Sequence, residues 1–297
     1  MLERVTFLLA VAFLATTGQA QIKVSRGLPL NADGAVRIYN LGGKVKVVGW
    51  ARDSVAVRGT MGNGSAFHMG GGRSGMKMFV EDADERNPAP ANLEVWVPFN
   101  AKLWIKTATA GIEVSGVTGS LDLYVVSGTI AVRGNPSDVN AEAIDGAIRI
   151  SGSPSWVRAK SASGDVSFDG KSPDVTISTV SGKIDVKGMK FEKAKFESVT
   201  GAIQFDGSFE RGGLINFDTH SGSIDVGLAS ESSADFDVVS IAGTIVNKLT
   251  PKRPAAGRYG RGAELETTAG NGGTRVMIRS FKGPVVLRSQ MIPTSSR

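Results

Sequence analysis

Apolar and polar residues alternate along this chain in short runs that return at a nearly constant interval. Each unit reads apolar-x-apolar-x-small, then two residues, then Gly-x-apolar-x-apolar. Alternation with a period of two predicts one short strand before the glycine and a second strand after it. The reference glycines lie 18 to 21 residues apart, at Gly128, Gly146, Gly164, Gly182, Gly201, Gly222 and Gly243, and Ala110 holds the same slot in the first unit.

Outlying copies of the unit extend the array in both directions. Residues 36–47 satisfy the template near the amino end, and residues 276–287 satisfy it near the carboxyl end. Because two short strands cannot bury their own apolar face, neighbouring units must stack and share a core. The pattern therefore predicts an all-β fold, a β-solenoid (β-helix-like) of stacked repeats of about 18–21 residues.

The turn around the reference glycine has a pattern of its own. The residue before the glycine is usually Ser, Thr or Asp, and the residue three positions before it is small or β-branched. We expect the side chain directly before the glycine to bond the turn backbone while the glycine adopts a positive φ. Stacked in register, these polar side chains would form a ladder along one edge.

A second column of residues lies two positions before the reference glycine and is almost entirely aliphatic. Its members are Val126, Ile144, Ala162, Val180, Val199, His220 and Ile241. If the strand bends at this point, the side chains rotate into the corner and complete the core, which is the arrangement we expect. If they face outward instead, they form an exposed apolar stripe, and such stripes usually mark partner surfaces.

The first twenty residues have the features of a secretory signal peptide. Arg4 precedes an apolar run over residues 5–15, and a polar stretch ends at Ala20. We predict a signal peptide at 1–20 and a single β-solenoid domain at 21–297, with insertions near 59–76 and 248–263. The first insertion is glycine-rich and the second is basic, and both are expected to be exposed loops.

Composition narrows the function further. The chain has no cysteine, which excludes disulfides and thiolate metal sites. Its formal charge of +6 comes without an arginine-rich tract carrying interleaved aromatics, so nucleic-acid binding is not expected. The only histidines are His68 and His220, and no spacing brings three metal ligands together. We expect no metal, no cofactor and no transmembrane segment in the mature chain.

The repeats resemble the putative-adhesin family of exported bacterial β-strand-repeat proteins, a family of unknown function. The likeness lies in SGTIAV at Ser127–Val132, SGKIDV at Ser181–Val186, GGKVKVVGWARDSVAV from Gly42, LEVWVP from Leu93 and GGTRVMIRSFKGPVVL from Gly272. The family offers no catalytic residues to transfer. Its adhesin label implies binding at a surface or envelope.

Reactive groups do not gather in any recognisable motif. Ser-Gly pairs recur in nearly every unit, where turn chemistry explains them, and no Gly-x-Ser-x-Gly elbow occurs. Asp185 and Asp225 occupy outward slots, and some β-solenoids place carboxylates on such a face to cleave polysaccharides. We expect a non-enzyme, with a polysaccharide-active lyase or hydrolase as the alternative and a structural or regulatory envelope component as a third possibility.

Three side chains are candidates for contact with a ligand or partner. Trp96 and Trp104 alternate with apolar neighbours and should lie on the outer side of their strands. There they would pack under the glycine-rich insertion or offer flat faces to sugar rings. His220 interrupts the aliphatic column. The expected partner is a cell-envelope polysaccharide or a surface or periplasmic protein, and the expected location is the periplasm, the cell surface or the medium.

Overall fold

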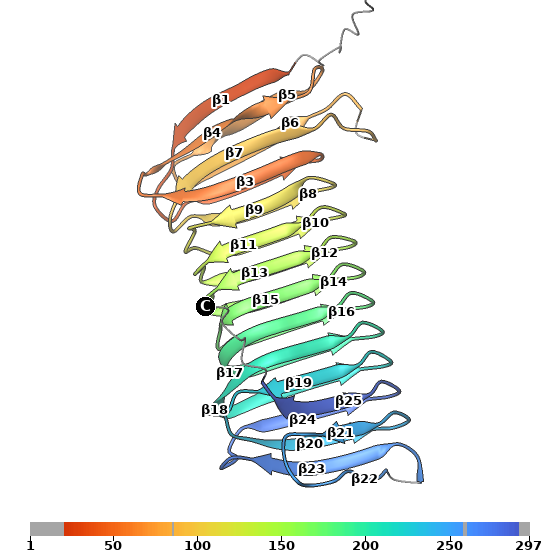
Figure 1. The fold of residues 1–297 in the computed structure, drawn as a ribbon. Coiled ribbons are helices and arrows are strands. Elements are labelled where there is room, and N and C mark those ends of the chain that lie inside the picture. Colours follow the sequence, from red (N-terminus) through yellow and green to blue (C-terminus); the bar gives the residue numbers. More distant parts are fainter. Residues whose placement is uncertain (1–20, 85, 258–259, 291–297) are drawn as a thin grey trace, which may run out of the picture.

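The chain is wound into a tall stack of coils (Figure 1). The computed structural model describes residues 21–84, 86–257 and 260–290, which carry 25 strands and no α-helix. The predicted signal peptide at 1–20 lies outside the described residues. The β-solenoid predicted from the repeat is confirmed, and each coil contributes two strands.

The two strands of each coil belong to two ladders that enclose the core. In order along the stack, face A consists of β5 (Ala66–Gly72), β6 (Gly75–Glu81), β2 (Ala35–Asn40), β8 (Lys102–Thr107), β10 (Leu121–Val125), β12 (Asp138–Ala143), β14 (Trp156–Ser161), β16 (Asp174–Thr179), the carboxyl halves of β17 (Ile184–Ser198) and β18 (Ile203–Thr219), β24 (Arg275–Ser280), β20 (Ala234–Ser240), β23 (Ala263–Ala269) and β22 (Ala255–Ala256).

Face B follows the same axis. It consists of β1 (Ile22–Pro29), β4 (Ser54–Met61), β7 (Ala91–Pro98), β3 (Gly43–Trp50), β9 (Gly111–Ser115), β11 (Ile130–Gly134), β13 (Ile148–Gly152), β15 (Val166–Lys171), the amino halves of β17 and β18, β19 (Ile224–Leu228), β25 (Val285–Ser289) and β21 (Ile245–Asn247). Because β17 and β18 each run through both faces, all 25 strands are connected into one sheet.

The repeat period is visible directly in the strand register. Leu121 pairs with Val139 on face A and Ile130 pairs with Ile148 on face B, so residues 18 apart lie side by side. Their side chains alternate between buried and outward positions, and the buried ones form one continuous core. Bulky residues of that core concentrate in the later coils, where Phe191, Phe205 and Phe217 contact one another or Phe196.

The reference glycines stand in file along the stack, but they are glycines for a reason other than the one expected. Those from Gly128 to Gly243 are absent from the residues with positive φ. Instead, a Cβ on Gly146 would clash with the carbonyl oxygen of Gly128, and one on Gly182 with that of Gly164. The coils touch backbone to backbone at this turn, so close approach excludes a side chain.

Both ends of the stack are wound out of sequence order. At the amino end, the β2–β3 coil packs directly on the β8–β9 coil, while β6 and β7 lie beyond it. At the carboxyl end, β24 lies between β18 and β20, and β25 lies between β19 and β21. The last repeat of the sequence is therefore an internal coil of the structure.

Antiparallel strands close the two ends. The glycine-rich segment 59–76 is not the flexible loop expected from its composition, because it completes β4 and forms the β5–β6 hairpin, whose register runs from Ala66–Glu81 to Gly72–Gly75. At the other end, β23 pairs antiparallel with β20, and the basic segment 248–263 is largely irregular apart from β22. Such caps end the parallel ladders with strands of different direction.

Candidate functional site

The aliphatic column before the turns faces solvent at every one of its members, so the expected burial in the corner is wrong. Val126 is 36% exposed, Val180 52% and Ile241 54%. The strand register places Phe281 next to His220 in the same file. We use the name apolar ladder for the file Val126, Ile144, Ala162, Val180, Val199, His220, Phe281 and Ile241.

The corner is already filled by the residue that precedes each member of the apolar ladder. Thr179 is buried and its Oγ1 donates to the carbonyl oxygen of Gly182 at 2.7 Å. Thr219 is also buried and its Oγ1 accepts from the backbone N–H of Gly222 at 2.9 Å. Because these small hydroxyl side chains bond the turn from inside, strand alternation continues and turns the next residue outward.

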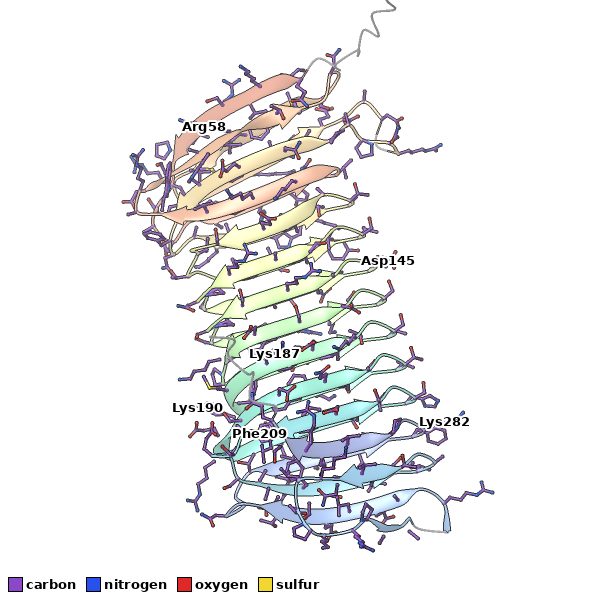
Figure 2. The ribbon with its side chains drawn as sticks, in the orientation of Figure 1. Arg58, Asp145, Lys187, Lys190, Phe209 and Lys282 are labelled. Atoms are coloured by element: carbon purple, nitrogen blue, oxygen red, sulfur yellow. The ribbon has the colours of Figure 1, made fainter. Side chains whose placement is uncertain are left out.

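A row of polar side chains runs beside the apolar ladder on its turn side. Most are the residues directly before the reference glycines, and several of them bond the neighbouring coil. Thr200 Oγ1 donates to the carbonyl oxygen of Val180 at 3.2 Å, and Ser163 Oγ donates to Asp145 Oδ1 at 2.8 Å. The ladder is thus a narrow apolar stripe with a polar margin, at the edge marked by Asp145 and Lys282 in Figure 2.

His220 and Phe281 form the aromatic part of the apolar ladder. Their rings are stacked with centroids 4.9 Å apart and an interplanar angle of 14°. One face of each ring is therefore covered by the other. Sequence reasoning missed Phe281 because its coil enters the stack out of order, although its position two residues before Gly283 would have assigned it to the column.

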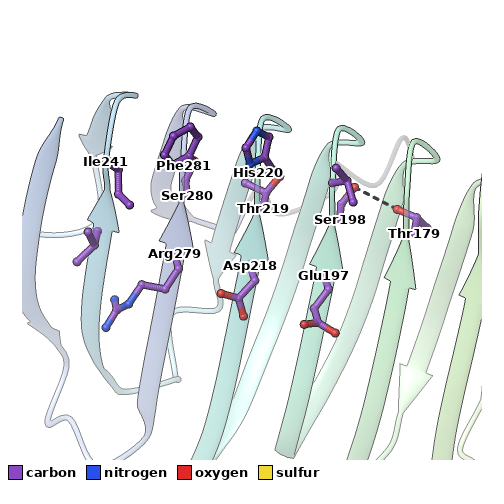
Figure 3. A pocket seen from close by; sticks show the side chains of 12 residues that line it. Thr179, Glu197, Ser198, Asp218, Thr219, His220, Ile241, Arg279, Ser280 and Phe281 are labelled. Atoms are coloured by element: carbon purple, nitrogen blue, oxygen red, sulfur yellow. Dashed lines mark hydrogen bonds between the residues drawn. The ribbon is translucent and has the colours of Figure 1, made fainter. Parts of the chain in front are cut away.

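A groove runs along face A beside this part of the apolar ladder (Figure 3). Its volume is about 430 Å³. One wall is apolar and the opposite wall carries charge, while buried hydroxyl side chains lie between them. The lining residues are Thr179, Glu197, Ser198, Val199, Asp218, Thr219, His220, Val239, Ile241, Arg279, Ser280 and Phe281.

The charged side chains of the groove differ in how well their charges are balanced by neighbours. Glu197 binds Lys195 at 2.7 Å, and Arg279 turns away to bind Asp237 at 2.7 Å. Partial burial raises the pKa of Asp218, the negative charge of Glu197 raises it further, and Lys195 and Arg279 lower it. Asp218 is the half-buried carboxylate of this wall whose charged form the surroundings disfavour.

This environment predicts a pH-dependent gain in stability for Asp218→Asn. A carboxyl with a raised folded-state pKa destabilises the fold above that pKa, and the penalty disappears as pH falls and the group is protonated. We expect the variant to have a higher Tm than the wild type at neutral pH, with a difference that shrinks on acidification. A difference that is absent at pH 7, or that grows as pH falls, would contradict the assignment.

The two candidate tryptophans lie apart from each other and from His220. Trp96, on face B, stacks on Trp50 with centroids 6.3 Å apart, and Arg58 lies 5.9 Å from its ring centre. Trp104, on face A, meets Tyr39 edge to face at 4.9 Å and lines a second groove of about 410 Å³. Both are half-buried on the outer side of their strands, and a sugar-binding role for them stays a prediction.

The described residues contain neither a metal-binding cluster nor a membrane-spanning helix. They contain no group of three or more His, Cys, Asp or Glu side chains placed to hold a metal ion. Within the same part of the chain, no helix is long and apolar enough to cross a membrane.

Comparison with known proteins finds a family model that matches part of the chain, and two solved structures at low identity. A family model described as Toastrack DUF4097 matches residues 154–287, which confirms over that range the predicted resemblance to a family of unknown function. No curated protein matches the chain.

Two solved structures are similar at very low identity. A "putative cell adhesion protein" from Clostridium sporogenes ATCC 15579 has a TM-score of 0.23 and 8% identity, covering 91% of this chain and 100% of that one. A "putative adhesin" from Bacteroides fragilis NCTC 9343 has a TM-score of 0.36 and 9% identity, covering 90% and 97%.

Proposed function

With residues 154–287 matching the Toastrack DUF4097 family, we propose that this chain is an exported, non-catalytic binding protein of the cell envelope or surface. Its contact surface is the apolar ladder, and its partner is a cell-envelope polysaccharide or a surface or periplasmic protein. The observation that carries the proposal is the file of exposed aliphatic and aromatic side chains along one edge of the stack.

The apolar ladder has the form of a contact surface for an elongated partner. Its eight members occupy successive coils, which at about 4.8 Å per layer makes a stripe roughly 34 Å long. Single exposed apolar residues are ordinary on protein surfaces, whereas contiguous stripes mark interaction sites. A partner that lies along the stack would cover many of these side chains at once.

The two outward carboxylates that the enzymatic alternative names are engaged in ion pairs. Asp185 binds Lys183 at 2.9 Å, and Asp225 binds Arg288 at 2.7 Å. These contacts favour a binding role over polysaccharide cleavage. The enzymatic alternative requires release of reducing ends or unsaturated sugars from a polysaccharide, with activity lost in Asp185→Ala or Asp225→Ala.

The proposed function is tested by removing apolar surface from the ladder without disturbing the core. In the combined variant Ile144→Ser, Val180→Ser and Val199→Ser, we expect binding to whole cells and to isolated envelope fractions to weaken at least tenfold. We expect its free energy of unfolding to change little, because exposed substitutions away from special features cost about 0.5 kcal/mol or less each.

A matched control removes equally exposed apolar residues elsewhere. Met189, Leu214 and Val246 are 59%, 43% and 42% exposed and lie outside the ladder. Their combined replacement by serine should leave binding intact. Equal losses in the two triple variants, or no binding by the wild type at any ionic strength, would refute a role for the ladder.

A further inference from the structure

The groove beside His220 and Phe281 offers two different surfaces to whatever lies in it. One wall consists of Val199, His220, Phe281 and Ile241, which belong to the apolar ladder. The other wall carries Glu197, Asp218 and Arg279, from three neighbouring strands. Figure 3 shows these charged side chains on the strands, and His220 and Phe281 where their strands end.

The charged wall has an unmatched negative charge. Lys195 is paired with Glu197 at 2.7 Å. Arg279 is held by Asp237 through Nη2–Oδ2 at 2.7 Å and Nη1–Oδ1 at 3.1 Å. Both neighbouring cations are thus paired with other carboxylates, whereas the side-chain carboxylate of Asp218 has neither a hydrogen bond nor an ion pair within the described part of the chain. A cation entering the groove would meet Asp218.

The apolar wall of the groove, which contains His220 and Phe281, is poorly suited to binding a sugar ring. Carbohydrate rings pack on exposed aromatic faces, but His220 and Phe281 each turn one face to the other. Along the file, Val199 follows His220 on the remaining side and Ile241 follows Phe281. Ring edges and aliphatic groups are therefore what this wall presents, a surface that suits the methylene stem of a long side chain.

From these two walls, we propose that the groove binds an extended segment of a partner protein and holds one of its lysine or arginine side chains. The aliphatic stem of that side chain lies against His220 and Phe281, and its charged head reaches Asp218. Asp218 and His220 are two residues apart on one strand, a separation of about 6.7 Å that the length of such a side chain can bridge.

The remainder of the bound segment would follow the apolar ladder beyond the groove. The ladder continues from Val199 to Val180 and Ile144 with comparable exposure, so apolar side chains of the segment have further contacts along the same edge. This inference rests on the proposed function and narrows its partner to a polypeptide with a basic residue among apolar ones.

The test uses a random peptide library displayed on phage, selected on the chain comprising residues 21–297. Selected peptides should be enriched in Lys or Arg flanked by apolar residues, and binding of the best of them should weaken about tenfold in Asp218→Asn. The matched control is Asp138→Asn, which removes an exposed carboxylate of face A outside the groove and should bind as the wild type does.

The outcomes separate this inference from the proposed function. Absence of basic enrichment, equal binding by Asp218→Asn and wild type, or binding of envelope polysaccharide without any peptide would overturn the groove inference. If the ladder triple variant still loses cell binding in those cases, the proposed function survives. If that variant binds cells like the wild type, the proposed function itself fails.

Discussion

Replacing Gly146 with alanine is expected to destabilise the protein by at least about 3 kcal/mol and to lower its Tm by roughly 10 °C. The added Cβ would clash with the carbonyl oxygen of Gly128 in the preceding coil. Backbone atoms of a stacked coil cannot move aside as a flexible side chain can, so the coils must separate locally. Thermal unfolding followed by circular dichroism measures the effect.

The control for this prediction lies in an equivalent turn of the stack. Gly111 has no positive φ, and a Cβ there would come no closer than 3.7 Å to its nearest neighbour, the carbonyl oxygen of Thr129. Gly111→Ala should therefore leave the Tm nearly unchanged. If Gly146→Ala were equally well tolerated, backbone contact between coils would not explain the glycine file.

Loss of the Arg288 side chain is the second change with a large expected effect. Arg288 binds Asp206 through two contacts of 2.7 and 3.0 Å and also approaches Asp225 at 2.7 Å. The side chains of Arg288 and Asp206 are only 12% and 14% exposed. Arg288→Met would leave two carboxylates without their cation, at a cost of about 3 kcal/mol.

Two further variants test how much the ion pair between Arg288 and Asp206 contributes to stability. Arg279→Met removes an exposed pair with Asp237 and should cost about 1 kcal/mol or less. In a double-mutant cycle, Asp206→Asn should recover part of the loss caused by Arg288→Met, because it removes one of the stranded charges. The prediction is wrong if the two arginine substitutions lower the free energy of unfolding equally, or if the effects of Arg288→Met and Asp206→Asn are strictly additive. Either result would mean that Arg288 contributes no more than an exposed ion pair does.

The same cluster explains a glycine that the repeat does not require. Gly227 lies between Asp206 and Arg288 in the register of three adjacent strands. A Cβ at this position would collide with both Asp206 Oδ1 and Arg288 Nη1. Glycine here leaves the space through which the two side chains meet across an intervening strand.

The fold could be predicted from the sequence because its information is periodic. Apolar residues at fixed offsets from each reference glycine define two strands, and the recurrence of this unit along the chain defines the stack and its shared core. The order of the end coils could not be obtained in this way. Residues 276–287 match the template equally well at the tip of the stack or inside it, and only contacts 60 or so residues apart decide between the two.

The candidate site was only partly predictable for a related reason. The aliphatic column was visible in the sequence, but its direction depends on which side chain fills the corner, and Thr179 and its equivalents take that place. Valine and isoleucine suit either environment, so residue type alone does not decide. The groove could not be predicted, because it forms only where Arg279 and Phe281 lie beside Asp218 and His220. The coil that enters the stack out of sequence order brings these two pairs together.

The insertion of β24 and β25 between earlier coils has a consequence for how the molecule assembles. During synthesis, β20 and β21 leave the ribosome before the strands on which they rest. The final turns cannot close until almost the entire polypeptide is available, whereas the middle of the stack can grow layer by layer. The segment that carries β24 and β25 is therefore inserted after the strands on both sides of it have been synthesised. A product truncated before this segment would leave the edges of β18 and β19 unpaired and open to association with other strands.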